Sequence, residues 1–338
     1  MTATTEPSAP LQVAPAWPIT FDEVLQARER LAPYLTTTPL RHYPLLDAQL
    51  GNGISLLVKH ENHQPTCSFK VRNGLSFVTA MNAQERAHGV VAASTGNHGQ
   101  GIAYAASLLD VRATICVPVG NNPEKGAAMR SWGAEVVEEG RDYDESVQAM
   151  LRIARERQAT VAHSTNDKRI VAGAATMTLE MLEQSGGLDA IVIAIGGGSQ
   201  SVGALTVARE LAPKMKVYGV QTAGAAAIHD SWHAGVPRAG AKADTFAEGV
   251  ATRTPYALTF ATLVEGLEDF VTVTDAELAE TIRMLLRTTH NLVEGAGAVG
   301  VAGAIKLRER LEGKRVGVIF SGANLDTAAL RRILNREI

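Results

Sequence analysis

The chain has 338 residues, of which 46% are hydrophobic, with a formal net charge of −3 and an isoelectric point near 6.3. That length can bury one large core or two moderate ones, and without a basic stripe the chain is not expected to bind nucleic acid. The two cysteines, Cys67 and Cys116, offer no disulfide framework and fit a reducing compartment. No apolar run reaches the ~18–20 residues of a membrane helix, so we expect a cytoplasmic protein without a membrane partner.

Helices and short apolar strands alternate along the chain after residues 1–16, a Pro-, Ala- and Thr-rich stretch predicted to be a disordered tail. In chain order the pattern predicts helix 21–34, strand 54–59, helix 68–81, strand 90–93, helix 98–109, strand 113–117, helix 124–132, strand 135–137, helix 143–157, strand 160–162, helix 170–184, strand 190–195, helix 202–211, strand 216–220, strand 270–273, helix 275–289, helix 299–311 and strand 316–320. Short apolar strands between helices predict an α/β fold with parallel sheets covered on both faces. The Gly- and Ala-rich stretch 223–255 shows no periodicity and is predicted to be a long connection beside the active site.

Three glycines follow the predicted buried strand at 190–195, and the segment 190–203 reads AIVIAIGGGSQSVG. Glycines let the backbone approach a phosphate closely, and the amides at a helix N-terminus point at the anion. Ser199 adds a hydroxyl donor. A tight turn without a ligand is the structural alternative. A dinucleotide site would need an acidic residue at the end of the next strand, where this chain has the neutral Gln221.

Three further segments carry polar or reactive side chains at the start of a helix or the end of a strand. Residues 93–100 read ASTGNHGQ, which suits a carboxylate, although Ser, Thr and Asn are also ordinary helix caps. Residues 65–73 read PTCSFKVRN and place Lys70 near a helix start, where an amine beside apolar walls can act as a nucleophile, whereas an isolated lysine is usually a solvated surface residue. Residues 320–326 read FSGANLD after a buried strand, so Ser321 can face a ligand or simply form a turn.

Taken together and in this order, the four segments resemble the fold-type II pyridoxal 5'-phosphate (PLP) enzymes, and within them the serine/threonine dehydratase and serine racemase branch. The resemblance runs from about residue 21 to the end of the chain. It implies a two-domain, tryptophan synthase β-like α/β fold. Residues 17–89 and 168–338 would form the large PLP-binding domain and residues 90–167 a small mobile domain. A homodimer is the family habit.

The resemblance also implies a role for each matching residue. Lys70 would carry the cofactor through its amine and act as the base at the substrate Cα, and Ser321 would bond the pyridine nitrogen. The remaining cofactor contacts would be Phe69 beside the ring, Asn97 on the 3-hydroxyl, Gly196, Gly197, Gly198 and Ser199 around the phosphate, Gly249 on the other ring face and Glu294 lining the site. The substrate would meet Ser94, Thr95, Asn97 and His98 at its carboxylate, with Thr252 shaping its pocket.

Departures from the family pattern narrow the expected function. Racemases place a serine where Thr95 stands as the second acid/base, and the Thr methyl restricts its rotamer, so racemisation ranks below elimination. Metal-activated members carry acidic residues where this chain has Gln221 and Ala227, so no divalent metal is expected there. Ser321, by contrast, follows the family pattern, and a serine rather than a carboxylate at the ring nitrogen favours prompt β-elimination over transamination.

The sequence therefore predicts a PLP-dependent dehydratase (an ammonia-lyase) acting on a small-molecule β-hydroxy amino acid: threonine, serine or a β-aryl serine such as phenylserine. The alternatives are a serine racemase-type enzyme of the same fold and, from another class, a nicotinamide-binding oxidoreductase.

Overall fold

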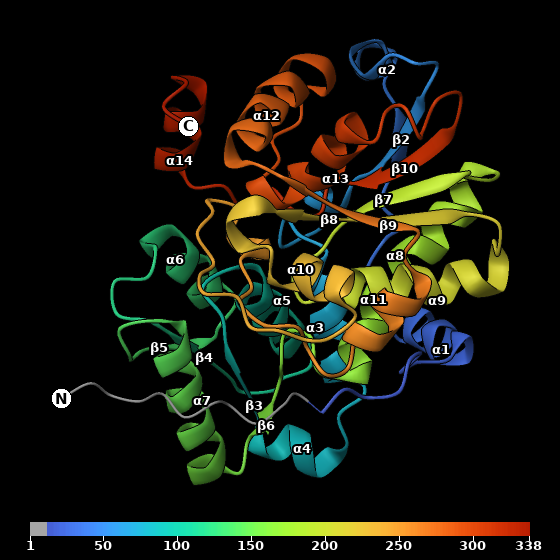
Figure 1. The fold of residues 1–338 in the computed structure, drawn as a ribbon. Coiled ribbons are helices and arrows are strands. Elements are labelled where there is room, and N and C mark those ends of the chain that lie inside the picture. The colour runs from blue at the N-terminus through green and yellow to red at the C-terminus, as the bar shows by residue number, and fades with distance from the viewer. Residues whose placement is uncertain (1–11) are drawn as a thin grey trace.

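Two β-sheets, each flanked by helices, organise the computed structural model of the protein, which describes residues 12–338 (Figure 1). The larger sheet has the strand order β1 (Leu40–His42), β2 (Ser55–Lys59), β10 (Arg315–Ile319), β7 (Ala190–Ala194), β8 (Lys216–Thr222) and β9 (Asp269–Val273). The smaller sheet has the order β5 (Glu135–Glu138), β4 (Ala113–Val117), β3 (Val90–Ala93) and β6 (Thr160–Val161). Every strand pair is parallel except β1 with β2. This is the predicted α/β architecture.

The helices lie between and around these strands in chain order. They are α1 (Phe21–Leu31), α2 (Pro44–Leu50), α3 (Lys70–Thr79), α4 (Ala83–His88), α5 (Asn97–Leu108), α6 (Pro123–Ser131), α7 (Tyr143–Arg157), α8 (Lys168–Ser185), α9 (Ser199–Leu211), α10 (Ala227–Ala234), α11 (Phe260–Gly266), α12 (Asp275–Thr289), α13 (Gly295–Lys306) and α14 (Thr327–Leu334), with short 3-10 turns at Glu61–His63, Ala223–Ala225 and Glu248–Val250.

The larger sheet buries both of its faces, because successive side chains of a strand point to opposite sides. In β7, Ala190 and Val192 join a core with residues of α12 and α13, whereas Ile191 and Ile193 join a second core with residues of α8 and α9. This explains why the strand reads as a continuous apolar run rather than an alternating one.

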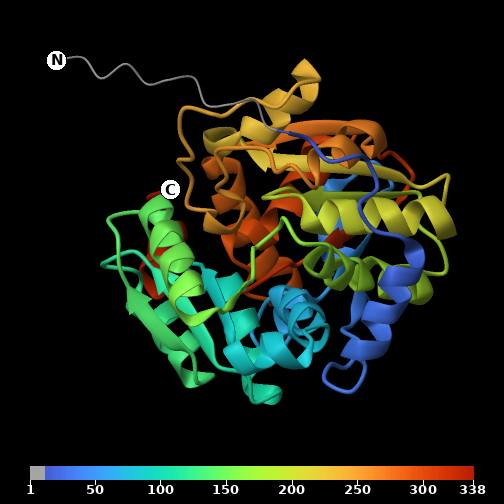
Figure 2. The ribbon, with the colours of Figure 1, turned by 90° about the horizontal axis from the view of Figure 1, so that it is seen from below.

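The smaller sheet is built the same way. Val90 and Ala92 of β3 pack with residues of α5, and Val91 and Ala93 pack with residues of α7. Figure 2 shows these cyan and green segments gathered beside the strands and helices of the larger sheet. The division into domains at 90 and 167, and the mobility of the smaller one, stay predictions.

Helix α3 lies between the two helix layers, packed on α5 and on α8. Glycines allow the backbones to approach this closely. A Cβ on Gly74 would lie 2.1 Å from the Gly101 carbonyl oxygen, and one on Gly101 would lie 2.4 Å from the Lys70 carbonyl oxygen. On the other side, a Cβ on Gly173 would lie 2.5 Å from the Arg72 carbonyl oxygen. The first turn of α3, which carries Lys70, is therefore fixed from both sides.

A buried ionic cluster holds the same turn. The Arg72 side chain is 1% exposed and donates to both carboxylate oxygens of Glu61 and of Glu180 at 2.7–2.9 Å. Lys59 donates to Glu180 Oε2 at 2.6 Å. Two cations thus meet two carboxylates, which is the condition under which buried charges are tolerated.

Several sequence predictions need correction. The helix predicted at 299–311 is α13, which begins at Gly295 and ends at Lys306. The stretch 223–255 was predicted to be irregular, yet it contains α10. Strand β1 and helices α2, α4, α11 and α14 were not predicted.

The predicted N-terminal tail, residues 1–16, is described only in part. Residues 1–11 of the predicted tail lie outside the described residues, whereas the Ala14 amide donates to the Ala257 carbonyl at 3.0 Å. None of the helices formed by residues 12–338 has both the length and the apolar character to cross a membrane.

Candidate active site

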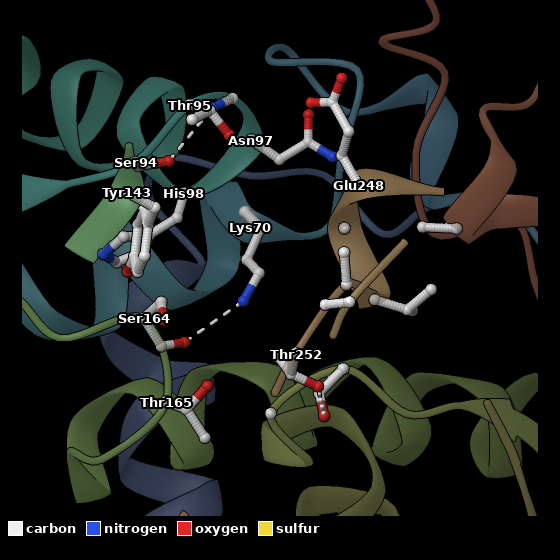
Figure 3. Close-up of a pocket in the computed structure, with 18 of the residues that line it drawn as sticks. Lys70, Ser94, Thr95, Asn97, His98, Tyr143, Ser164, Thr165, Glu248 and Thr252 are labelled. Carbon is white, nitrogen blue, oxygen red and sulfur yellow. Dashed lines mark hydrogen bonds between the residues drawn. The ribbon is translucent and has the colours of Figure 1, made fainter. Parts of the chain in front are cut away.

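A cavity of about 860 Å³ lies at the carboxyl ends of β3, β7 and β10 (Figure 3). Ligands of open α/β sheets collect at this edge. Every residue that the sequence predicted for the site lines this cavity: Phe69, Lys70, Ser94, Thr95, Asn97, His98, Gly196, Gly197, Gly198, Ser199, Gly249, Thr252, Glu294 and Ser321. The structure thus brings the four segments together, and the roles assigned to single residues stay predictions.

Lys70 and Ser321 are held together by the backbone. The Phe69 amide donates to the Ser321 carbonyl at 3.0 Å, and Ser68 forms a β-bridge with Gly322. The Lys70 Nζ atom donates to the Ser164 carbonyl at 3.3 Å (Figure 3). The same atom lies 5.1 Å from the centre of the Phe69 ring. Burial lowers the pKa of Lys70 to about 8. At pH 7 about a tenth of this amine is therefore unprotonated, far more than for an ordinary lysine, and can act as a nucleophile or base.

The glycine loop at 196–198 lines the cavity, and its carbonyls and amides differ in how they are bonded. The carbonyl of Gly196 accepts from Thr252 Oγ1 at 3.3 Å, and that of Gly197 accepts from Thr259 Oγ1 at 2.8 Å. Within residues 12–338 no group accepts a hydrogen bond from the amides of Gly196, Gly197 or Gly198. Gly198 has a φ of +96°, which favours glycine. Helix α9 begins at the next residue, so amides without a protein acceptor lie beside a helix N-terminus, an arrangement that can bind an anion.

The loop between β3 and α5 forms a second set of free amides. Ser94 Oγ accepts from the amides of Gly96 and Gly99 at 3.2 and 2.9 Å, which curls the loop around it. Within the described residues the amides of Thr95, Asn97 and His98 donate to no protein group. They are therefore available to a carboxylate at the N-terminus of α5.

The imidazole of His98 is neutral in this environment. Its Nε2 atom pairs with the Ala162 carbonyl at 2.9 Å, which assigns the proton to Nε2 and leaves Nδ1 as an acceptor. Burial and then the nearby Lys70 lower the pKa of His98 to about 3. A neutral imidazole with this tautomer has no further N–H to donate to a carboxylate. Of the His98 groups, only the backbone amide can therefore donate to a substrate carboxylate.

Asn97 is held at both ends of its side chain. Its Nδ2 atom donates to Glu294 Oε1 at 2.6 Å, and its Oδ1 atom accepts from Asn324 Nδ2 at 2.7 Å. Burial raises the pKa of Glu294 to about 7, against the opposing effect of the Asn97 hydrogen bond. Asn324 belongs to the segment 320–326, which the sequence marks as a candidate for the site, but nothing in the sequence indicates that this side chain contacts Asn97.

Sequence reasoning missed the wall opposite Lys70. Tyr143, Ser164, Thr165 and Tyr256 all line the cavity, and His163 lies edge-on to Tyr256 with ring centres 5.3 Å apart. A Cβ on Gly197 would lie 2.1 Å from Thr165 Oγ1 and 2.8 Å from Tyr256 Cε2, so the wall touches the glycine loop. The sequence predicts a helix that begins at Tyr143, but this gives no indication that the side chain lines the site. The residues at 163–165 form no recognisable motif.

Residues 31–322 match the family of pyridoxal-phosphate dependent enzymes. The chain belongs to this family. An L-threonine ammonia-lyase of Thermotoga maritima is 35% identical over 320 residues, 95% of this chain and 79% of that protein. An L-threo-3-hydroxyaspartate ammonia-lyase of Pseudomonas sp. is 35% identical over 306 residues, 90% of this chain and 95% of that protein. The crystal structure of a T.th. threonine deaminase superposes with a TM-score of 0.86 at 34% identity, covering 91% of this chain and 99% of that one.

These findings confirm the predicted family, fold class and cofactor: the protein is a fold-type II PLP-dependent lyase of the serine/threonine dehydratase branch. The residues of the cavity fit the cofactor. Lys70 supplies an amine whose only hydrogen bond within the described residues is to a carbonyl, the loop at 196–199 supplies unpaired amides for a phosphate, and Ser321 supplies a hydroxyl at the cavity wall.

The prediction that no divalent metal binds is a separate matter. No group of three or more His, Cys, Asp or Glu side chains gathers as a metal site within residues 12–338. The Gln221 side chain is bonded to protein groups at both ends, to the His229 amide and to Thr252 Oγ1. That activity needs no divalent metal stays a prediction, and the chelator experiment proposed in the Discussion would test it.

Proposed function

We propose that the protein is an ammonia-lyase that converts a β-hydroxy α-amino acid with an uncharged side chain to a 2-oxo acid and ammonia. Threonine, serine and a β-aryl serine such as phenylserine are the candidate substrates. The observation that carries the proposal is the pairing of charges around the cavity. Lys125 Nζ lies 2.6 Å from Glu248 Oε2, and Arg253 pairs with Asp144. All four of these residues line the cavity.

The charge pairing bears on the substrate side chain. A hydroxyaspartate would bring a second carboxylate, and binding it would require a cation from one of these pairs. The carboxylate left unpaired is 53% exposed in Glu248 and 64% exposed in Asp144, so it returns to water and the loss of either pair costs about 1 kcal/mol or less. A neutral side chain carries no such cost.

The uncharged wall favours a substrate side chain with apolar surface. Tyr143 and Tyr256 line the cavity, and burial raises the pKa of Tyr256 to about 12, so it stays a neutral phenol. Aromatic rings favour an edge-to-face or offset partner at ~4.5–7 Å, which an aryl group supplies. A cavity of about 860 Å³ falls within the ~300–1,000 Å³ of small-molecule sites and leaves room for an aryl group.

Several of the predicted roles have a physical basis in the site. When bound, PLP supplies the electron sink that makes the substrate Cα–H acidic. We infer that Lys70 holds the cofactor and that its Nζ atom accepts the Cα proton, since burial keeps the amine partly unprotonated. The amides at 196–198 hold the phosphate, and those of Thr95, Asn97 and His98 hold the substrate carboxylate. Ser321 meets the ring nitrogen.

The test is a panel of L-serine, L-threonine, phenylserine and 3-hydroxyaspartate at equal concentration, assayed for ammonia and for 2-oxo acid. We expect release from at least one neutral substrate with kcat/KM about twofold to fivefold above that of hydroxyaspartate, the range that an exposed ion pair supplies. A preference for hydroxyaspartate would refute the charge argument. Recovery of the D-amino acid in place of a 2-oxo acid would instead make the protein a racemase.

The Lys70 assignment has its own controls. Lys70→Ala should abolish ammonia release, and borohydride reduction of the wild-type protein should attach the cofactor mass to the peptide that contains Lys70. Lys168→Ala changes a lysine outside the cavity lining and should leave both results as in the wild type. Turnover by Lys70→Ala near the wild-type rate would contradict the assignment.

A further inference from the structure

The side chain of Gln221 joins three segments beneath the glycine loop. Gln221 lies near the end of β8 and is fully buried. Its Oε1 atom accepts from the His229 amide at 3.0 Å, and its Nε2 atom donates to Thr252 Oγ1 at 3.3 Å. The residue before α10, Ala226, has no side chain that caps the helix, so Gln221 supplies the missing acceptor in the first turn.

The hydrogen bonds run in one direction from Gln221 to the loop. An amide NH₂ group can only donate, so the Thr252 oxygen accepts from it and the Thr252 hydroxyl proton is left to donate. The acceptor within reach is the Gly196 carbonyl, at 3.3 Å. A neutral amide at 221 therefore determines where the Thr252 proton points.

The Gly196 carbonyl determines in turn where the next amide points. The C=O of Gly196 and the N–H of Gly197 belong to one planar trans peptide unit, in which they point in opposite directions. Holding the carbonyl toward Thr252 turns the Gly197 N–H away from it. Within residues 12–338 that N–H has no protein acceptor, and Gly197 lines the cavity.

We propose that Gln221 is a positioning residue for the cofactor phosphate, acting through Thr252 and the Gly196–Gly197 peptide. The inference rests on the proposed assignment of the loop at 196–199 to the phosphate. It gives Thr252 a second role beside its predicted place in the substrate pocket. It also accounts for a neutral amide at 221, because a carboxylate could accept from His229 but could not donate to Thr252.

The substitution Gln221→Glu separates this role from helix capping. A carboxylate at 221 still accepts from the His229 amide, but it draws the Thr252 proton toward itself and away from Gly196. Thr252→Val removes the same hydroxyl from the other side. Thr259→Val is the matched control, since the Thr259 hydroxyl serves the Gly197 carbonyl independently of Gln221.

The measurement compares the dissociation constants of PLP and of pyridoxal, which lacks the phosphate, by titrating the visible absorbance of the bound cofactor. A chelator is present so that a new carboxylate recruits no cation. The wild type should prefer PLP. Gln221→Glu and Thr252→Val should each lower that preference about 3- to 10-fold, the range of one hydrogen bond, with pyridoxal binding within about 2-fold of the wild type.

A double-variant cycle excludes a direct charge effect of the new carboxylate on the phosphate. If Gln221 acts through Thr252, Gln221→Glu should have little further effect in the Thr252→Val background, whereas Thr259→Val should add its own loss to either variant. A full additional loss from Gln221→Glu in that background would overturn the proposal, because charge repulsion needs no hydroxyl.

Three other outcomes would overturn either the role of Gln221 or the phosphate assignment. A PLP preference in Gln221→Glu equal to that of the wild type overturns the inference, and so does an equal loss of PLP and pyridoxal binding, which would mean that Gln221 serves only the fold. If the wild type binds pyridoxal as tightly as PLP, the phosphate assignment itself fails. Thr252→Val carries the test if Gln221→Glu does not fold.

Discussion

We expect Glu294 to make the stability of the protein depend on pH. Its carboxyl lies at the N-cap of α13 and bonds Asn97, and burial raises its pKa from 4.5 to about 7. That difference corresponds to about 3 kcal/mol by which folding disfavours the ionised carboxylate. The folded state binds the extra proton between the two pKa values. Stability due to this group is therefore fully present below about pH 4.5 and lost as the pH rises through about 7.

Glu294→Gln removes the titrating proton and keeps the shape of the side chain. We expect the stability of this variant, relative to the wild type, to increase by up to about 3 kcal/mol between about pH 5 and pH 8. The assay is urea unfolding of cofactor-free protein at several pH values, with fluorescence and circular dichroism compared to establish that one transition is measured. A constant difference between the two proteins across this range would refute the reasoning.

The matched control makes the same substitution at an exposed carboxyl. Glu309 is exposed and forms no ion pair within the described residues. Glu309→Gln should therefore give a difference from the wild type that stays flat with pH. A pH-dependent gain in both variants would show that overall charge, rather than the burial of Glu294, is responsible.

Three further predictions concern the buried cluster, a strained backbone position and metals. Arg72→Ala leaves two buried carboxylates facing one lysine and should cost about 3–5 kcal/mol in urea unfolding, whereas Arg28→Ala, which breaks an exposed pair, should cost less than ~1 kcal/mol. Cys67 is exposed with a φ of +51°, so Cys67→Gly should raise the unfolding free energy by up to about 1 kcal/mol, and a loss would contradict this. A divalent-metal chelator should leave ammonia release unchanged, and a loss reversed by Mg²⁺ would count against the interpretation of Gln221 and Ala227.

The sequence predicted those parts of the site in which the functional residues and the strand or helix that positions them lie within a few consecutive residues. The run 196–199 follows a buried strand and opens a helix, so its glycines indicate an anion loop wherever the strand lies. Lys70 stands in a segment of the same kind, between a loop and a helix. Because the carboxyl ends of parallel strands meet at one edge, the convergence of these segments followed from the fold.

The missed residues act through contacts between distant parts of the chain. Ser164 offers Lys70 only a backbone carbonyl, which any residue type provides. Thr259 reaches the Gly197 carbonyl from 62 positions away. No local pattern encodes such pairs, so sequence reasoning had nothing to detect.

Helix α13 was misplaced because packing overrode helix propensity. Its first residues, 295–300, read GAGAVG, and glycine is a poor helix former in isolation. In the fold the helix lies against β7 and β8, where a Cβ on Gly300 would be 2.9 Å from the Val192 carbonyl oxygen and one on Gly303 would be 2.2 Å from Val220 Cγ2. The glycines that look like a loop are therefore the residues that let the helix pack so closely on the sheet.

Under the proposed function the site would recognise anions with backbone amides rather than with charged side chains. Burial shifts Lys70 and Glu294 toward their neutral forms, with pKa values of about 8 and about 7, while Lys125 and Arg253 each face a carboxylate. Binding of a phosphate and a carboxylate would therefore depend on amides at the N-termini of α9 and α5, which have no backbone acceptor within the described residues. Such amides carry no net charge, and their positions are fixed by the backbone. A lysine side chain, in contrast, can change rotamer to keep its contact with a ligand that shifts. The direction of these amides would be set by the residues that hold the neighbouring carbonyls, and our proposal therefore counts Thr252, Thr259 and the amide of Gln221 among the groups that recognise the cofactor.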